Sequence, residues 1–363
     1  MTNTSLTIGV VGFNGLVGME LLKLLLTKEN IRIICYKRES SGIVYKDDKT
    51  NLPPHPAQLE NYNLQSARNC DFVFLCATSE FSRIEAPKII ENNKTVVIDN
   101  SSEFRYKNSV PLVIPEINGH ILTQNNYQLI SNPNCTTAIL LMAIFPIYKQ
   151  FGIKKIIVST YQSVSGAGRD GLNQLMTEVS NYEHGDPEPI NNYSLGYPIL
   201  FNIIPKIDYV PPGQHCTFEE LKVALETQKI LEDSQIKISC TAVRVPVIRS
   251  HSLSVTLETV KNITKDSAIN CLLTTKGVNI LDDVTNNIYP MPTNTSFQHN
   301  VNVGRIRAPS GVFDNGIDIF ICGDQLLKGA SLNAFQIFEL ICKINFNESD
   351  MLDNNSVASA VKG

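Results

Sequence analysis

Cys135 is the strongest candidate in the sequence for a reactive side chain. It lies in the polar stretch SNPNCTT, residues 131–137, between an apolar run that ends at Ile130 and a helix-like run over residues 138–145. A cysteine placed where a strand ends and a helix begins meets the free N–H groups and positive dipole end of the helix, which favour a thiolate. A lone cysteine is more often a buried structural residue. Its role as a nucleophile therefore depends on which other groups meet it.

Three polar residues in the second half of the chain are candidates to meet Cys135. His251 starts an alternating apolar run, and Arg244 lies seven residues before it. Histidine is well suited to move a proton near neutral pH, although a histidine at a strand margin is most often simply hydrogen bonded. Gln162 ends another apolar run and precedes the small-residue loop SVSGAG, which lets the backbone approach a ligand closely.

Charged residues that suit an anionic or zwitterionic ligand occur in two places. Glu219 and Lys222 are three residues apart on a helix that we expect to begin after Thr217, so they share one face. They form either a solvated salt bridge or a carboxylate and an ammonium that bind a zwitterion and a phosphate. Arg105 ends the polar loop NSSEFR, and its planar guanidinium matches phosphate or carboxylate oxygens, with a surface ion pair as the alternative.

A glycine-rich turn near the start of the chain is typical of a nucleotide site. Gly12, Gly15 and Gly18 form the pattern GxxGxxG between a predicted strand at 6–11 and a predicted helix at 19–26. Glycines there allow a tight turn and let a pyrophosphate approach the helix N-terminus. The motif is weak by itself, but the order strand, turn, helix favours a dinucleotide site over a plain structural turn.

The turn after the next predicted strand, residues 31–36, would read the adenosine ribose. Its sequence is KRESSG, so Arg38, Ser40 and Ser41 could hold a 2′-phosphate, whereas Glu39 would repel one. A solvated charged turn is the alternative.

The order of the predicted elements indicates the fold class of the first part of the chain. Predicted strands at 70–77 and 95–99 flank a predicted helix at 80–91. Alternation of strands and helices predicts a parallel, doubly wound α/β sheet.

The pattern changes at about residue 151. Strands are expected at 154–160, 239–245, 253–258, 300–308 and 316–322, with the second and third as an antiparallel pair. Residues 180–215 are expected to form an extended surface or dimer-contact loop. The strongly periodic helix at 329–345 is expected to pack back on the first domain.

Composition narrows the classes of partner. The chain has 363 residues, 43% of them apolar, enough for about two domains of ~150 residues. A net charge of −4 gives no basic field for nucleic acid or anionic membranes, so a small molecule is the expected partner. The nine cysteines are scattered singly, which fits a reducing cytoplasm and no metal site. With no signal segment and no apolar run of ~20 residues, neither secretion nor membrane insertion is expected.

Taken in order, these motifs resemble those of bacterial aspartate-β-semialdehyde dehydrogenases over residues 6–346. The matching pieces are the glycine turn, NSSEFR at 100–105, SNPNCTT at 131–137, YQSVSGAG at 161–168, EELK and ETQKIL after Glu219, RVPVIRSHS around Arg244 and His251, and VGRIR near residue 303. The resemblance implies a Rossmann-like NADP-binding domain, residues 1–133 plus 329–363, and an α+β catalytic and dimerisation domain, residues 134–328.

The resemblance also implies roles for individual residues. Cys135 is similar to the family's nucleophile, His251 to its acid/base and Gln162 to the residue that orients the acyl intermediate. Substrate groups would be bound by Glu219 (amino), Arg244 (carboxylate), Arg105 and Lys222 (phosphate), and Asn134 beside the nucleophile. The expected cofactor residues are Gly12, Asn14, Gly15, Leu16, Val17, Arg38, Ser40, Ser41, Ser165, Gly166 and Gln325.

The reaction that the resemblance implies is the reduction of β-aspartyl phosphate to aspartate β-semialdehyde, in the biosynthesis of lysine, threonine and methionine. The Cys135 thiolate would displace phosphate, and the resulting thioester would accept hydride from NADPH. A homodimer is implied, and a tetramer remains open. Two departures from the family pattern concern the cofactor: Glu39 replaces an arginine in the ribose turn, and Asp324-Gln325 replaces an Asp-Asn pair.

Two rival functions remain at this stage. N-acetyl-γ-glutamyl-phosphate reductase shares the mechanism and a loop like residues 163–169, but its nucleophile usually follows Pro-Gly, and the EELK helix does not belong to it. A catalytically inactive nucleotide-binding homologue would have no need of Cys135 or His251.

Overall fold

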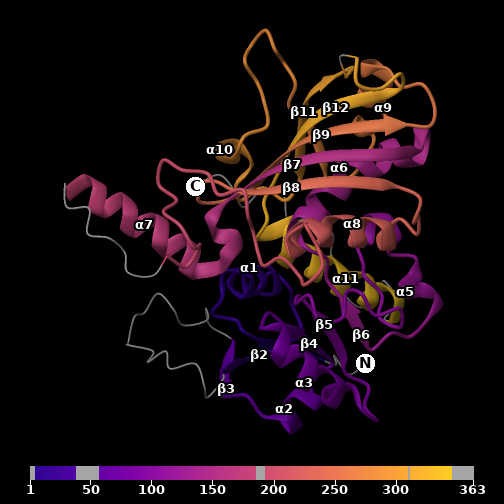
Figure 1. Cartoon of the computed structure of the whole chain (residues 1–363). Helices are drawn as coiled ribbons and strands as arrows, with labels where there is room; N and C mark the ends of the chain where they lie inside the picture. The colour runs from indigo at the N-terminus through magenta and orange to yellow at the C-terminus, as the bar shows by residue number, and fades with distance from the viewer. Residues whose placement is uncertain (1–4, 38–56, 185–192, 310, 346–363) are drawn as a thin grey trace.

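The computed structural model describes residues 5–37, 57–184, 193–309 and 311–345, and Figure 1 shows two sheets in separate lobes. The residues of the ribose turn, Arg38, Glu39, Ser40 and Ser41, lie outside the described part.

The first lobe is built on a six-stranded parallel sheet with the order β3-β2-β1-β4-β5-β6. Its strands are β1 (Leu6–Val11), β2 (Ile31–Lys37), β3 (Gln58–Asn61), β4 (Phe72–Leu75), β5 (Val96–Asp99) and β6 (Leu129–Ser131). Its helices are α1 (Leu16–Leu25), α2 (Leu64–Arg68), α3 (Ser79–Ile90), α4 (Pro115–Asn118) and α5 (Ile121–Gln124). Apolar clusters on both faces explain why β4 is apolar at every position. The strand order reverses between β1 and β4, which is where open α/β sheets bind ligands.

The second lobe contains a mixed sheet with the order β10-β11-β12-β9-β7-β8. Its strands are β7 (Ile153–Gln162), β8 (Lys237–Arg244), β9 (His251–Thr259), β10 (Val278–Ile280), β11 (Val301–Arg307) and β12 (Gly316–Gly323). Apolar residues of α6 (Cys135–Phe151), α8 (Phe218–Ile230) and α9 (Lys265–Leu273) share one core with this sheet. On β7, buried side chains alternate with exposed ones that include Ile157 and Tyr161. The second sheet therefore has one helix-covered face and one face open to solvent, on which β7 exposes Ile157 and Tyr161.

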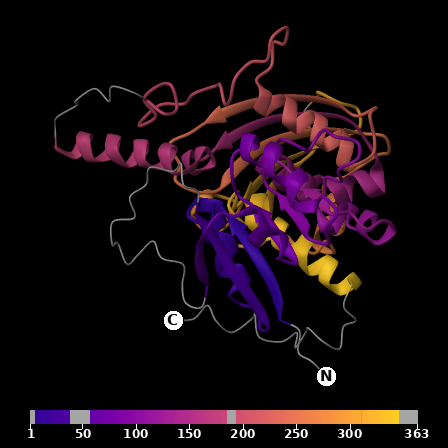
Figure 2. The ribbon, with the colours of Figure 1, turned by 90° about the horizontal axis from the view of Figure 1, so that it is seen from below.

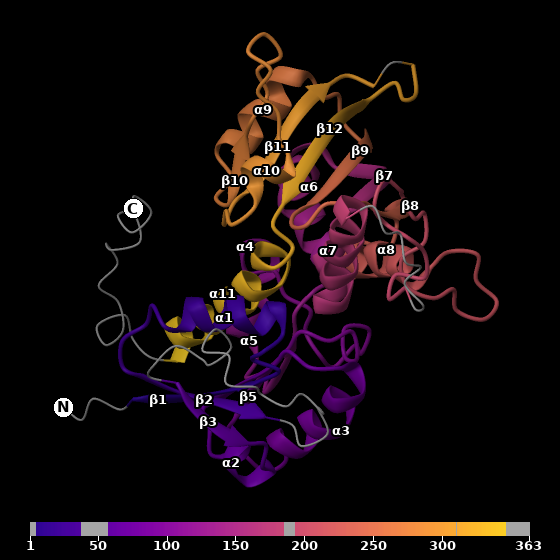
Figure 3. The same ribbon diagram turned by 90° about the vertical axis from the view of Figure 1, so that its left-hand side faces the viewer.

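The last helix, α11 (Leu332–Asn345), follows a short π-helical turn at Leu327–Ser331. Its side chains Phe335 and Phe338 join the core between α1 and the first sheet, as predicted, and Figure 3 shows α11 beside α1. The proposed domain boundaries at 133/134 and 328/329 stay a prediction.

Two expectations about the second lobe are wrong. The strands β8 and β9 run antiparallel but do not pair, because β7 lies between them, parallel to β8 and antiparallel to β9. The start of the expected 180–215 loop is helical, since α7 (Gly168–His184) runs directly from the small-residue loop. Figures 1 and 2 both show α7 projecting away from the body. This lobe also contains the short helix α10 (Pro292–Thr295) and a 3-10 turn at Val164–Ala167.

Candidate active site

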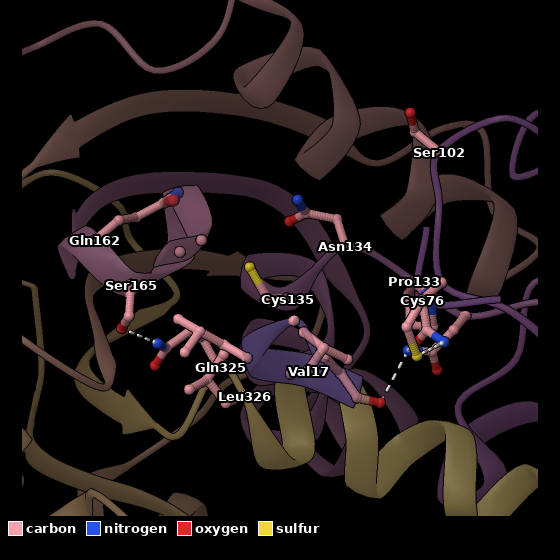
Figure 4. Close-up of a pocket in the computed structure, with 18 of the residues that line it drawn as sticks. Val17, Cys76, Ser102, Pro133, Asn134, Cys135, Gln162, Ser165, Gln325 and Leu326 are labelled. Atoms are coloured by element: carbon pink, nitrogen blue, oxygen red, sulfur yellow. Dashed lines mark hydrogen bonds between the residues drawn. The ribbon is translucent and has the colours of Figure 1, made fainter. Parts of the chain in front are cut away.

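A cavity of about 530 Å³ lies between the two lobes, where the N-termini of α1 and α6 meet the ends of β7 and β12. Thirteen of the predicted site residues line it: Gly15, Leu16, Val17, Arg105, Asn134, Cys135, Gln162, Ser165, Gly166, Glu219, Lys222, Arg244 and Gln325. Figure 4 shows Cys135, Asn134 and Gln162 around this cavity. Residues that are far apart in the chain, such as Gly15 and Gln325, thus face one space.

Cys135 is the first residue of α6, and Asn134 is its N-cap. The side-chain Oδ1 of Asn134 accepts the backbone N–H groups of Thr136 at 2.9 Å and Thr137 at 3.2 Å. This cap satisfies donors that a helix start leaves free, and it fixes the direction of the first residue. The Sγ of Cys135 lies 3.4 Å from Nε2 of His251, so the structure brings the two predicted reactive groups together.

The environment of the Cys135 thiol is less favourable to a thiolate than the sequence indicated. Burial raises the pKa of Cys135 to about 11, and the Glu219 carboxylate adds to the rise. The positive charges of Arg105 and Arg244 oppose it. Burial therefore opposes the thiolate that the helix terminus favours, and the role of Cys135 as nucleophile stays a prediction.

His251 is completely buried, and its ring is oriented by Ser163. The backbone N–H of Ser163 donates to Nδ1 at 3.1 Å, and the Ser163 hydroxyl lies 3.2 Å from the same nitrogen. An Nδ1 that accepts a hydrogen bond carries no proton, so the neutral ring has its proton on Nε2, toward Cys135. Burial and the nearby Arg244 charge hold the pKa of His251 well below its ordinary value of 6.5.

The neutral His251 ring should make the folded protein sensitive to acid. Below pH 6.5 the unfolded ring takes up a proton while the folded ring does not, so the unfolded state binds more protons and is favoured. Below about pH 6 we expect His251 to cost about 1.4 kcal/mol of the free energy of unfolding per pH unit, until its folded pKa is reached. Urea denaturation of the wild type and His251→Gln between about pH 7 and about pH 5.5 measures this. Equal pH slopes in the two proteins would contradict it.

Glu219 is the centre of a buried polar cluster beside the nucleophile. Its Oε1 accepts from Nδ2 of Asn134 at 3.1 Å and from Nε2 of Gln162 at 3.2 Å, and its Oε2 lies 3.2 Å from Nζ of Lys222. Burial works to raise the pKa of Glu219, but the Lys222 ammonium and these hydrogen bonds hold it below the usual range. Glu219 therefore presents a negative charge to the cavity at neutral pH.

Arg244 lies at the end of β8, next to the reactive pair. Its Nη1 donates to the backbone carbonyl of Ser163 at 2.7 Å, which joins it to the residue that orients His251. A Cβ on Gly166 would lie 2.8 Å from both Nη1 of Arg244 and Cε1 of His251. Any side chain at position 166 would thus push against both groups, which explains the need for glycine there.

Arg105 is buried and held on two sides. Its Nη1 donates to Oε1 of Glu226 at 3.0 Å and its Nη2 to the carbonyl of Asn100 at 2.8 Å. Its Nε is buried with no hydrogen-bond partner among the described residues. Because Arg105 also lines the cavity, its guanidinium charge is placed to attract an anion there.

Glu226 is a site residue that the sequence reasoning missed. Its carboxylate is fully buried; Oε2 accepts the backbone N–H of Asn134 at 2.6 Å, and Oε1 accepts the Tyr106 hydroxyl at 3.2 Å as well as Arg105. One side chain thus holds both the loop before the nucleophile and the candidate phosphate arginine. The available signal was spacing, since positions 219 and 226 are seven apart and share a helix face.

Replacing Glu226 by glutamine should remove the negative charge that pairs with Arg105 and place a neutral amide beside the guanidinium. Breaking one side of a buried ion pair typically costs about 3–5 kcal/mol of the free energy of unfolding. Denaturant unfolding of Glu226→Gln should show a loss of that order. Glu103→Gln, which breaks a surface pair with Lys107 at 3.7 Å, is the control and should change little. A loss no larger than the control's would mean that the buried pair is not structurally important.

The glycine turn fits a pyrophosphate. Gly12 has φ +77°, and a Cβ there would lie 2.2 Å from the carbonyl oxygen of Cys76, while one on Gly18 would lie 2.3 Å from that of Gly12. Both positions therefore require glycine. The N-terminus of α1 has no side-chain cap at Gly15, so its first-turn N–H groups are suited to bind a phosphate.

Other predicted cofactor residues have structural partners. Gly12 and Asn14 are not among the lining residues; the Asn14 carbonyl accepts from Nε of Arg169 at 3.0 Å, a cross-lobe contact that the sequence did not indicate. The Gln325 amide donates to the Ser165 hydroxyl at 2.6 Å, drawn in Figure 4, and accepts the backbone N–H of Ser250 at 2.7 Å. Gln325 therefore ties the small-residue loop to the backbone just before His251.

Two family models together match most of the chain. The family model described as semialdehyde dehydrogenase, NAD binding domain, matches residues 7–125, and the one described as semialdehyde dehydrogenase, dimerisation domain, matches residues 144–328. The aspartate-semialdehyde dehydrogenase of Aquifex aeolicus is 37% identical over 93% of this chain and 98% of its own. The chain belongs to the aspartate-semialdehyde dehydrogenase family. The motif-based recognition is therefore confirmed.

Further relatives of this family match along most of their length. The Synechocystis sp. enzyme is 36% identical over 92% of this chain and 96% of its own. A crystal structure of aspartate semialdehyde dehydrogenase II from Vibrio cholerae, complexed with ASA, has a TM-score of 0.83 at 32% identity and covers 94% of this chain and 99% of that one. The predicted two-part architecture, a Rossmann-like nucleotide domain with a second domain, is confirmed. Among the described helices, none is both long and apolar enough to cross a membrane.

Proposed function

We propose that this chain catalyses the NADPH-dependent reduction of β-aspartyl phosphate to aspartate β-semialdehyde and phosphate through a thioester on Cys135. The observation that carries the proposal is the 3.4 Å contact between Sγ of Cys135 and Nε2 of His251, beside a cavity lined by Glu219, Arg244 and Lys222. These residues supply a nucleophile, a proton-transfer group and binding charges for an amino acid that carries a phosphate.

The first half-reaction forms the thioester. The Cys135 sulfur attacks the acyl carbonyl, the bond from carbon to the phosphate oxygen breaks, and the thiol proton leaves with the phosphate. Arg105 and Lys222 stabilise the negative charge of the departing phosphate. Gln162 and Asn134 line the cavity with Cys135, and both amides donate to Glu219, so these side chains are held where they can orient the acyl group.

The second half-reaction reduces the thioester. NADPH, when bound, supplies the hydride to the acyl carbon. As the carbon–sulfur bond then breaks, the Cys135 sulfur must take up one proton from solution, and His251, whose Nε2 lies 3.4 Å from Sγ, is placed to pass that proton on. The low pKa of the ring means that His251 carries an extra proton only transiently.

Charge in the cavity distinguishes this substrate from that of N-acetyl-γ-glutamyl-phosphate reductase. Glu219 is a buried carboxylate at the cavity wall, which favours a free α-ammonium group over a neutral, bulkier acetylated amine. Arg244 offers a guanidinium to the substrate carboxylate. The family membership and the intact reactive pair likewise do not favour an inactive nucleotide-binding homologue.

The chain is proposed to act as a homodimer that joins through the open face of the second sheet. Ile157 and Tyr161 of β7 are exposed there, and the Tyr161 ring lies 6.4 Å from that of Phe320 on β12. Apolar side chains gathered on one face are typical of an interface between subunits. Sedimentation at micromolar concentration should show a dimer; a monomer would contradict the proposal, and a tetramer would require a second interface.

The reaction is tested in the oxidative direction. Purified protein is supplied with NADP, phosphate and either aspartate semialdehyde or N-acetylglutamate semialdehyde, and NADPH formation is followed by absorbance. Phosphate-dependent reduction with aspartate semialdehyde alone is the expected result. Activity with the acetylated substrate alone, or with neither, would overturn the proposal.

A further inference from the structure

The ammonium of Lys222 already holds two carboxylates. Its Nζ lies 2.7 Å from Oδ2 of Asp208 and 3.2 Å from Oε2 of Glu219. All three residues line the cavity. Asp208 comes from the segment before α8, which is fixed beside the site because Ile204 and Arg244 exchange two backbone hydrogen bonds, at 2.9 Å and 2.8 Å. Lys222, the candidate phosphate-binding residue, is therefore closest to the Asp208 carboxylate.

The charges around the cavity are balanced without a substrate phosphate. Arg105, Lys222 and Arg244 supply three positive charges; Asp208 and Glu219 at the wall, and Glu226 behind Arg105, supply three negative ones. A zwitterionic amino acid leaves this balance unchanged, but a phosphate adds about two negative charges. Binding of the phosphate therefore requires that one carboxylate move away or that excess negative charge accumulate in a partly buried space.

Of the three carboxylates, Asp208 is the one that can move away from the cavity most easily. Its side chain is 29% exposed, against 7% for Glu219 and 0% for Glu226. It lies on a loop rather than a helix, and its backbone has φ +70°, a conformation that costs free energy in most residues other than glycine. Turning the Asp208 carboxylate toward water exposes a charge at little cost, whereas either glutamate would have to break buried hydrogen bonds.

We infer that Asp208 is an internal anion that occupies Lys222 and is displaced by the substrate's phosphate, so that it sets the affinity of the enzyme for phosphate. This inference rests on the proposed function, because it assumes that Lys222 binds the phosphate group. Asp208 weakens phosphate binding by competing for the ammonium, and it keeps the charge of Lys222 satisfied when no phosphate is bound.

Asp208→Asn tests the competition, because it removes the charge and keeps the shape. Asparagine adopts positive φ readily, and its Oδ1 can still accept the Tyr209 N–H, as the aspartate does at 2.9 Å. In the oxidative assay at constant ionic strength, the KM for inorganic phosphate should fall about 3- to 10-fold, and the KM for aspartate semialdehyde should stay unchanged. Asp266→Asn, an equal charge change at an exposed position on α9, should leave both constants unchanged.

The double variant shows whether the effect passes through Lys222. Lys222→Met should raise the KM for phosphate, and adding Asp208→Asn to it should bring no further change. The inference is overturned if the KM for phosphate rises or stays the same in Asp208→Asn, since Asp208 would then position Lys222 or do nothing. It is also overturned if the fall persists in the Lys222→Met background.

A binding measurement separates this inference from the proposed reaction. Inorganic phosphate is used to protect Cys135 against iodoacetamide, and modification is read on the peptide that contains Cys135. Protection at lower phosphate concentration in Asp208→Asn than in the wild type supports the inference; protection at equal concentrations overturns it. A wild type that is protected but shows no phosphate-dependent oxidation of the aldehyde would refute the reaction and leave the competition standing.

Discussion

Cys135→Ser should lower kcat at least about 1,000-fold while the protein remains folded and binds NADP. Serine has nearly the same shape and keeps the helix start, because the Asn134 cap uses the backbone of Thr136 and Thr137 and not the sulfur. The loss comes from the chemistry: a hydroxyl is far harder to deprotonate than a thiol, and an ester accepts hydride less readily than a thioester. Turnover of aspartate semialdehyde with NADP and phosphate measures it.

Two other cysteines make this test specific. Cys216 is exposed. Cys76 lines the same cavity, but it follows β4, and its Sγ contacts the Asn100 amide at 3.4 Å instead of His251. Neither Cys216→Ser nor Cys76→Ser should approach the loss seen at position 135. If Cys135→Ser retained substantial turnover, the thioester mechanism would be wrong and the inactive-homologue reading would have to be reconsidered.

Elements with strong local signals could be predicted from the sequence. The strand at 6–11 has the bounds of β1, and the helix expected after Thr217 is α8, with Thr217 as its N-cap in a capping box with Glu220. These features depend on neighbours in the chain: an apolar run buried on both faces and a hydroxyl three residues before a glutamate. Local rules therefore sufficed for them.

Pairings between distant segments could not be predicted in this way. The insertion of β7 between β8 and β9 depends on how three strands share one helix-covered face, which no alternation pattern specifies. The same holds for Glu226 with Arg105, which are 121 residues apart, and for Arg249, which pairs with Glu20 of α1 at 2.8 Å and Asp324 at 2.7 Å. The motifs identified which residues come together in the site. Which ion pairs those residues form depends on how the side chains are buried against one another.

The protonation of the site was likewise beyond the sequence. The helix start at Cys135 favours a thiolate, but burial and the Glu219 charge raise the pKa of the thiol. In the same way, a histidine that looked like a general acid/base near its ordinary pKa is buried neutral beside Arg244. Desolvation is a property of the folded cavity, so no spacing of residues reports it.

His251→Gln should lower kcat about 100-fold or more, with little change in cofactor binding. Glutamine fills part of the space of the ring and offers an N–H donor to Sγ of Cys135, but it cannot transfer a proton. The effect should therefore fall on kcat and on its pH profile, whose dependence on His251 should disappear. Steady-state kinetics over a pH series, together with NADP binding, measures both.

His251→Ala is the informative companion, because it removes the donor as well as the proton. If proton transfer is the main contribution of His251, the glutamine and alanine variants should lose similar amounts of turnover. If the Nε2–H donor to Sγ matters more, the glutamine variant should retain much more activity than the alanine one. Since Ser163 fixes the ring with its proton on Nε2, both contributions act through the same atom, and only this comparison divides them. Turnover close to the wild type in both variants would remove His251 from the mechanism.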